Sequence, residues 1–180
     1  MKHYFILYKP FLLFLGKFFL TYLLLTVAYQ VYLATTPDEG IDGITSNVAH
    51  LTEKTANLIG INISTDVGHL CYNIIYHQKI VGRIIEGCNA ISVIILFVSF
   101  IVAFSGKLKQ TLLYVLAGSV LIYLLNILRI VLLVVLVYNY PSEEHLLHGV
   151  LFPLIIYGIV FILWVIWVNK FSKYASKTAK

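Results

Sequence analysis

The sequence predicts an all-α polytopic membrane protein with about four transmembrane helices and one extracytoplasmic loop. Of its 180 residues, 60% are hydrophobic and 12% are charged, whereas soluble domains are about half apolar and a quarter charged. The apolar residues come in runs of about 20 or more, the length that a helix needs to cross a bilayer. These observations exclude a water-soluble globular domain. We expect a single membrane-embedded domain over residues 1–180.

The first apolar run predicts a span over residues 11–33. It is too long, and too polar at its end, for a cleaved signal peptide, and no small-residue cleavage site with a soluble region follows it. We therefore expect a retained first helix.

Residues 34–87 are polar and hold most of the acidic side chains, which predicts a loop outside the membrane. In its first half, residues 44–59 are apolar near a 3.6-residue period, which is typical of an amphipathic helix lying at the membrane interface. In its second half, the alternation in residues 72–76, the polar break at 77–79 and the extended run 80–85 predict a β-hairpin.

Three further apolar runs predict spans at about 90–104, 111–138 and 148–168. The run 111–138 has about 28 residues, so it exceeds a roughly 30 Å hydrocarbon core and must tilt or protrude. The last run ends with Trp164 and Trp167, which is typical of an aromatic belt at the membrane interface.

The distribution of basic residues predicts the orientation. With four spans, both termini and the turn 105–110 share one side of the membrane, and that side holds most of the lysines. The positive-inside rule then places both termini in the cytoplasm and the polar loops outside, facing the periplasm if the membrane is a bacterial inner membrane. The net charge of +5 therefore reports topology, and we expect no nucleic-acid partner.

Three separate segments deliver reactive side chains to one predicted membrane depth. Cys88 lies at the outer end of the second span, and Arg129 lies roughly 27 Å along the third, near its outer end. His145 and His148 lie where the fourth span begins. Such a set supports acyl transfer through a thioester, because histidine can accept the thiol proton while arginine stabilises the thiolate or the oxyanion.

Cys88 and Arg129 each have a structural alternative. A cysteine at a helix start is often a small buried residue, although a helix N-terminus beside a cation favours the nucleophilic thiolate. Outside the cytoplasm Cys88 could instead form a disulfide with Cys71. Arg129 could extend toward the outer headgroups, but a charge in an apolar span usually marks function or an internal partner.

Polar neighbours leave further choices open. Asn126 lies one turn before Arg129 and could orient its guanidinium or hydrogen-bond a neighbouring helix. His145 and His148 share a helix face and could be interfacial residues or a pair of metal ligands, although two ligands without a third are weak evidence for a metal site.

Two functions from other classes compete with an enzyme. One is a non-enzymatic subunit of an envelope export or transport complex, in which Arg129 pairs with a partner's intramembrane carboxylate. The other is a small carrier of a ligand or metal that uses the two histidines. The chain holds no dinucleotide, phosphate-loop or metalloprotease motif, and we expect no cofactor.

Four short motifs occur in a characteristic order: Glu-Gly-Cys-Asn-Ala at 86–90, Asn-Ile-Leu-Arg at 126–129, His-Leu-Leu-His-Gly at 145–149 and Leu-Trp-Val-Ile-Trp-Val at 163–168. In this order the chain resembles the exosortase/archaeosortase family over about residues 5–172. The short four-span form is most similar to the exosortase F branch of Bacteroidetes.

The resemblance implies a multipass cysteine transpeptidase or protease that removes the C-terminal sorting tail of exported proteins. Its catalytic set would be Cys88, Arg129 and a histidine. The family pattern of histidine followed four residues later by glycine fits His145, whereas membrane depth favours His148, so both stay candidates.

This chain also departs from the family. Asn89-Ala90 follow the cysteine where many members have Ser-Gly, and larger members have about eight spans. The implied partners are exported proteins with a transmembrane sorting tail, together with membrane lipid. Recognition of the tail would then use an accessory membrane protein or the 34–87 loop.

Overall fold

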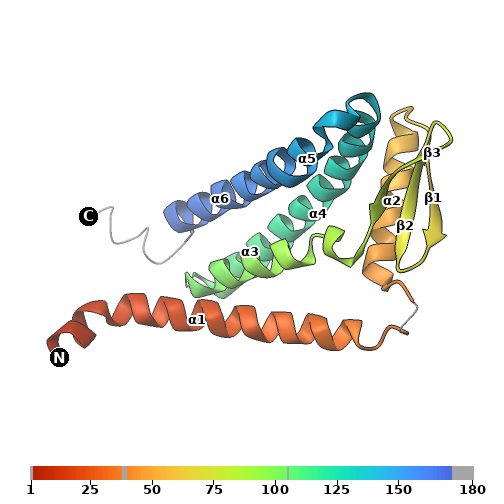
Figure 1. Ribbon diagram of the computed structural model, residues 1–180. Coiled ribbons are helices and arrows are strands. Elements are labelled where there is room, and N and C mark those ends of the chain that lie inside the picture. Colours follow the sequence, from red (N-terminus) through yellow and green to blue (C-terminus); the bar gives the residue numbers. More distant parts are fainter. Residues whose placement is uncertain (1, 38–39, 105, 172–180) are drawn as a thin grey trace.

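The computed structural model describes residues 2–37, 40–104 and 106–171, which form mostly helical structure with one small sheet (Figure 1). The helices are α1 (Lys2–Leu33), α2 (Gly43–Leu58), α3 (Ile91–Ala103), α4 (Leu108–Asn139), α5 (Glu144–Leu146) and α6 (Phe152–Lys170). The strands are β1 (Ile63–Gly68), β2 (Cys71–Tyr76) and β3 (Lys79–Ile84). Figure 1 shows α2 and the sheet together at one end of the long helices.

Among the described residues, three helical stretches are long and apolar enough to cross a membrane. They are Tyr8–Leu33 within α1, Leu108–Asn139 in α4, and Pro141–Lys170, which includes α6. The predicted span at 90–104 folds as α3, which has 13 residues and is therefore only about 20 Å long against a hydrocarbon core of about 30 Å. The predicted count of four membrane-spanning helices is thus not confirmed.

Helix α4 belongs to both buried clusters of the protein. The first cluster lies between α2, the sheet and the C-terminal half of α4, and includes Val48 and Val131. The second joins α3, α4 and α6 and includes Phe97 and Ile122. Gly118 of α4 makes the second cluster possible, because a side chain there would overlap the Phe97 ring. Helix α4 therefore holds the sheet and α2 in place relative to α3 and α6.

The sheet is antiparallel with the order β1-β2-β3. The predicted hairpin is confirmed as β2 and β3, joined at His77 and Gln78, whose positive φ values of 50° and 62° are typical of a two-residue type I′ turn. The sequence analysis missed β1. Its residues are largely exposed and only Ile63 is buried, so the strand carries no apolar alternation.

The amphipathic pattern in residues 44–59 forms α2. The Asp42 side chain caps this helix by accepting hydrogen bonds from the backbone N–H groups of Ile44 and Thr45, both at 3.0 Å. Its apolar face, with Val48 and Ala49, packs against the sheet and α4. The pattern predicted the helix, but the face expected at a membrane interface is buried inside the protein.

Trp167 also differs from its sequence-based expectation. Its side chain is completely buried, and its indole N–H donates a 3.0 Å hydrogen bond to the carbonyl of Phe104. Gly106 leaves room for the ring. Trp167 therefore ties α6 to the end of α3 rather than facing an interface.

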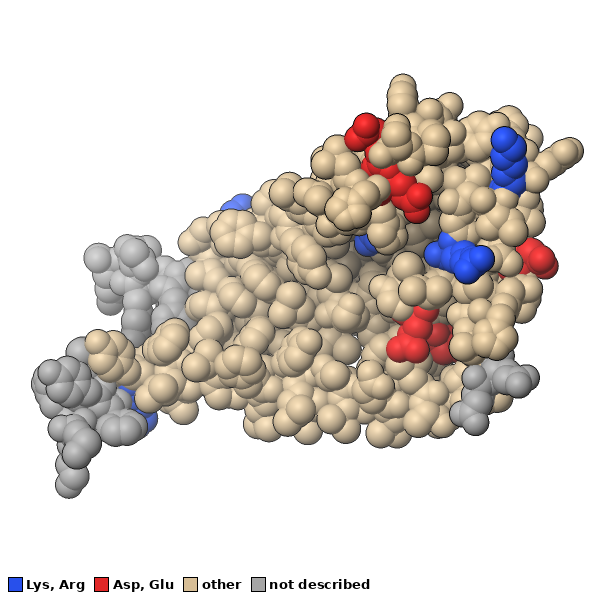
Figure 2. All heavy atoms as spheres, viewed as in Figure 1, with Lys and Arg blue, Asp and Glu red and all other residues tan. Residues whose placement is uncertain are grey.

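Charge is concentrated at the sheet end of the molecule. In Figure 2 the acidic side chains gather over the end that carries α2, the sheet and α5, while the visible surface along the helices is largely uncharged. The cavity described below lies at this charged end.

Candidate active site

Cys88 ends a short 3-10 helix, Glu86–Cys88, that connects β3 to α3. Its backbone N–H donates to the carbonyl of Ile85 at 2.8 Å, and its own carbonyl accepts a 2.7 Å hydrogen bond from the Asn126 side chain. The residue is half-buried and its thiol is free. The backbone is therefore held from both sides while the thiol stays accessible.

Asn126 answers one question that the sequence left open. Its amide, which is buried, donates to Cys88 in the preceding segment rather than orienting Arg129 one turn along α4. Of the two predicted roles, the contact to a neighbouring segment is the one observed. This bond joins the cysteine loop directly to α4.

Asn89 has a structural role that the sequence analysis missed. Its amide nitrogen lies 2.7 Å from the Tyr29 hydroxyl of α1 and 3.2 Å from the Thr45 hydroxyl of α2, and its side-chain oxygen accepts from the Ile91 N–H at the start of α3. Ala90, between them, adopts a left-handed φ of 64°. An asparagine just before a helix is a capping signal that could have revealed part of this role.

Arg129 lies on α4 and lines the same cavity as Cys88. Its Nε atom is buried and has no hydrogen-bond partner within the described part of the chain. The guanidinium therefore belongs to the inside of the cavity rather than to the outer surface. An unpaired buried donor is unfavourable unless a ligand satisfies it.

The two histidines separate. His148 lies in a π-helical segment, Leu147–Leu151, and lines the cavity together with Cys88 and Arg129. His145 does not line this cavity and lies in a neighbouring surface hollow. The expected common face therefore does not bring both rings to the thiol.

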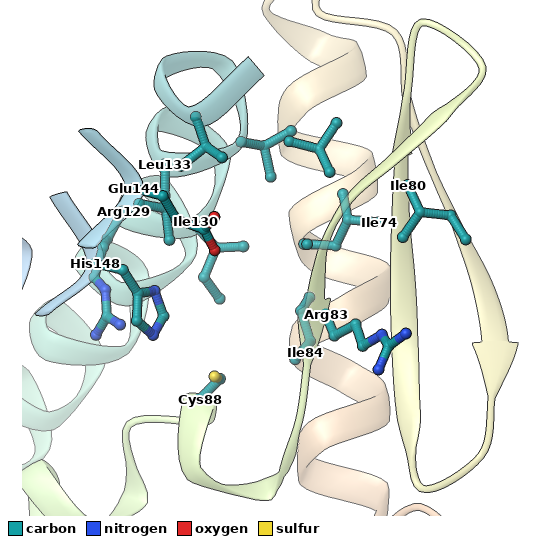
Figure 3. A pocket seen from close by; sticks show the side chains of 14 residues that line it. Ile74, Ile80, Arg83, Ile84, Cys88, Arg129, Ile130, Leu133, Glu144 and His148 are labelled. Carbon is teal, nitrogen blue, oxygen red and sulfur yellow. The ribbon is translucent and has the colours of Figure 1, made fainter. Parts of the chain in front are cut away.

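The cavity has a volume of about 460 Å³ and lies between the sheet and α4. Figure 3 shows the Cys88 thiol, the His148 ring and the Arg129 guanidinium converging on this space from three segments. Apart from Arg129, the wall on α4 is apolar, and β3 forms the opposite wall together with Ile74 of β2. Further residues that line the cavity include Ile80, Arg83, Ile130, Leu133, Val134 and Glu144.

Glu144 is a further lining residue that the sequence analysis did not single out. It lies four residues before His148 in the helical stretch leading into α6, a spacing that places side chains on neighbouring turns. An acidic residue at this spacing before a histidine was the available signal. With Arg129 it gives the cavity one fixed charge of each sign on the α4 and α5 side.

Cys71 is not part of this arrangement. It is buried at the start of β2, opposite Gly68 of β1, and its thiol is free. The disulfide considered between Cys71 and Cys88 is therefore absent in this structure. Among the described residues, no three histidine, cysteine or acidic side chains are grouped to hold a metal ion.

The whole chain was compared with known protein families. The family model described as transmembrane exosortase (Exosortase_EpsH) matches residues 3–169. The chain belongs to the transmembrane exosortase family. The matched range includes Cys88, Arg129 and both histidines. No curated protein and no solved structure gives a significant match.

Membership in the exosortase family confirms the resemblance drawn from the four motifs at the level of the family. Together with the three long apolar helices, it identifies a membrane protein.

Proposed function

We propose that this exosortase family member is a membrane-embedded cysteine transpeptidase or protease that cleaves C-terminal sorting signals of exported proteins. One observation carries the proposal: Cys88, Arg129 and His148, from three segments distant in sequence, line one cavity. Cysteine, a base and a fixed cation are the groups that acyl transfer through a thioester requires.

The steps follow from the roles of these groups. His148 accepts the proton of the Cys88 thiol, and the thiolate sulfur bonds to the scissile carbonyl carbon while Arg129 donates hydrogen bonds to the oxyanion. The C–N bond then breaks, the leaving amine takes the proton from His148, and a thioester remains. Water or an acceptor amine attacks the thioester carbon, and its proton returns through His148 to the departing sulfur. Water gives hydrolysis, and an amine gives transpeptidation.

His148 is the proposed acid and base, and His145 is not, because only the first lines the cavity with the thiol. This choice departs from the histidine-glycine spacing, which favoured His145. The exosortase F branch remains the proposed place of the chain within the family.

The proposed orientation places both termini in the cytoplasm of a bacterial inner membrane and the cavity toward the periplasm. The surplus of lysines in the terminal and 105–110 segments and the acidic sheet end support it. In this orientation α3 crosses the membrane in addition to the three long helices. The C-terminal apolar helix of a substrate would lie in the bilayer beside the cavity.

The deciding experiment compares Cys88→Ala with Cys71→Ala, each at wild-type abundance in the native organism. The readout is the uncleaved form of exported proteins that end in a single apolar helix. Accumulation in Cys88→Ala alone is expected, since Cys71 lies outside the cavity. Normal cleavage in both variants would refute the enzymatic function.

The same assay tests the histidine. His148→Ala is expected to slow cleavage by about 10²-fold or more, the usual contribution of a general acid or base, while His145→Ala has a much smaller effect. A reversed order would move the catalytic role to His145.

A non-enzymatic subunit is the second candidate, and the unpaired Nε of Arg129 favours it, since a partner's carboxylate could bind there. It predicts that Arg129→Gln disrupts a complex while Cys88→Ala has no effect. The Cys88 comparison therefore separates the two functions.

A further inference from the structure

Strand β3 is an edge strand. Within the described residues it has β2 as a strand neighbour on one side, and its other side borders the cavity. Residues 80–84 of this strand all line the cavity. From its end, the chain runs through residues 85–87 directly to Cys88. The free edge thus leads to the proposed nucleophile.

The register shows which backbone groups face away from β2. Tyr76 and Lys79 flank the two-residue turn and exchange hydrogen bonds, so the next pair, Ile75 and Ile80, does not. The N–H and C=O of Ile80 therefore point outward. After the bulge opposite Ile74, the same alternation turns the backbone of Arg83 outward.

The opposite edge of the sheet supports this register. By the same count along β1, the backbone of Thr65 points outward, and its N–H indeed donates to the Glu53 carboxylate of α2 at 3.1 Å. The β1 edge is therefore partly satisfied by a side chain of α2. The β3 edge borders a cavity instead.

The side chains of β3 leave its backbone accessible. In Figure 3, Ile80 and Arg83 point away from α4, so these residues present mainly backbone to the cavity. Apart from Arg129, the facing wall on α4 is apolar, with Ile130, Leu133 and Val134. A backbone edge opposite an apolar wall fits an extended peptide, which needs hydrogen bonds along one side and apolar contact for its side chains.

The charge of β3 restricts which peptide segments can pair with it. Strand β3 carries Lys79 and Arg83 and no acidic residue, and like charges on adjacent strands repel. Cations on an edge also oppose pairing between copies of the same strand. Neutral or acidic side chains opposite Lys79 and Arg83 therefore favour the pairing of an extended segment with this edge.

We propose that the free edge of β3 binds the peptide segment next to the scissile bond as a fourth strand, which brings its carbonyl to Cys88. The inference rests on the proposed function and adds its mode of substrate recognition. It assigns substrate positioning to the 34–87 segment of this chain.

The test removes one outward N–H group from each edge. Ile80→Pro deletes the donor on β3, and Val67→Pro deletes the equivalent donor on β1, where Val67 is also next to a residue of a turn-flanking pair. The two side chains are similarly exposed, at 61% and 66%. Proline is tolerated at outward positions of edge strands. The probe is a tagged exported protein that ends in one apolar helix and is cleaved in cells that carry the wild-type protein.

At matched abundance, Ile80→Pro is expected to slow cleavage of this probe about tenfold, while Val67→Pro stays within about twofold of wild type. If Cys88→Ala blocks cleavage but Ile80→Pro behaves like Val67→Pro, strand addition is wrong and the proposed function stands. If Cys88→Ala cleaves normally, the proposed function fails and the inference fails with it.

Both proline variants could lose activity because proline damages the sheet. A cross-linking measurement then tests strand addition without proline. A photoreactive amino acid replaces Ile80 or Val67 in the Cys88→Ala protein, which leaves the backbone intact. An adduct with the probe from position 80 and none from position 67 supports the inference. Equal adducts, or none from position 80, would overturn it.

Discussion

At the scale of single residues, two asparagines hold the backbone around Cys88. Asn126 donates to the Cys88 carbonyl from α4, and Asn89, the next residue in the chain, is bound to Tyr29 and Thr45 of α1 and α2. A nucleophile is effective when its position is fixed before the substrate binds. These bonds fix the loop and leave the thiol free.

Asn126 is therefore predicted to act as a positioning residue. Asn126→Ala leaves the Cys88 carbonyl without this donor, and cleavage should fall about tenfold. The rate at which a maleimide modifies Cys88 should also change, which reports the thiol's surroundings independently of substrate.

Asn139→Ala is the matched control, because its side chain makes a bond of the same length, 2.7 Å, to the Val135 carbonyl on an exposed part of the same helix. If both variants cleave and react alike, Asn126 has no positioning role.

At the scale of elements, the crossing of α3 and α4 sets the distance between the cysteine loop and Arg129. Phe97 of α3 lies over Gly118 of α4, where the absence of a side chain allows close approach. Asn126 lies about two turns farther along α4, where its side chain reaches Cys88, three residues before the start of α3. Close packing at one end thus permits the hydrogen bond at the other.

Gly118→Ala should separate these helices. Its methyl group would overlap the Phe97 ring, and overpacking of this kind costs about 1–3 kcal/mol of unfolding free energy. The expected result is a lower midpoint of thermal unfolding in detergent.

Gly158→Ala in α6 is the control, since nothing lies within 4 Å of an added Cβ there. It should be neutral or slightly stabilising, because alanine favours helix more than glycine. Combining Gly118→Ala with Phe97→Leu should restore part of the loss, and an unchanged midpoint for Gly118→Ala would contradict the packing argument.

At the scale of the whole molecule, the cavity borders the first buried cluster, with which it shares Ile74, Ile84, Ile130 and Val134. The sheet supplies one wall, α4 the other, and the segment leading into α6 supplies His148. In sequence, the short helix α3 connects the sheet to the turn 105–110, which the proposed orientation places in the cytoplasm. The membrane topology therefore depends on whether α3 crosses the bilayer.

Cysteine labelling tests whether α3 crosses the bilayer. In a Cys71→Ala, Cys88→Ala background, which removes both cysteines of the chain, single cysteines replace Gln78 in the hairpin turn or Lys107 after α3. A membrane-impermeant maleimide applied from outside should modify position 78 and spare position 107. Modification of both would show that α3 does not cross, and would require a different side for the C-terminus.

The sequence by itself determined the class of the protein and the order of its elements. Long apolar runs predicted α1, α4 and the α6 stretch, because a helix that crosses a bilayer needs apolar residues over its whole length. Alternation predicted the β2–β3 hairpin, because a strand buried on one face has a period of two residues. The order of the cysteine, arginine and histidine motifs was sufficient to predict the family.

The tertiary structure decided which side chains meet. A helix that is apolar on all sides carries no period that fixes its rotation, so the sequence left open whether Arg129 faced lipid or Cys88. Neither the separation of His148 from His145 nor the partly exposed strand β1 has an apolar signature in the sequence. Trp167 and the apolar face of α2 were both expected at a membrane interface. An apolar surface packs equally well against lipid or protein, and only the fold shows that both are buried inside.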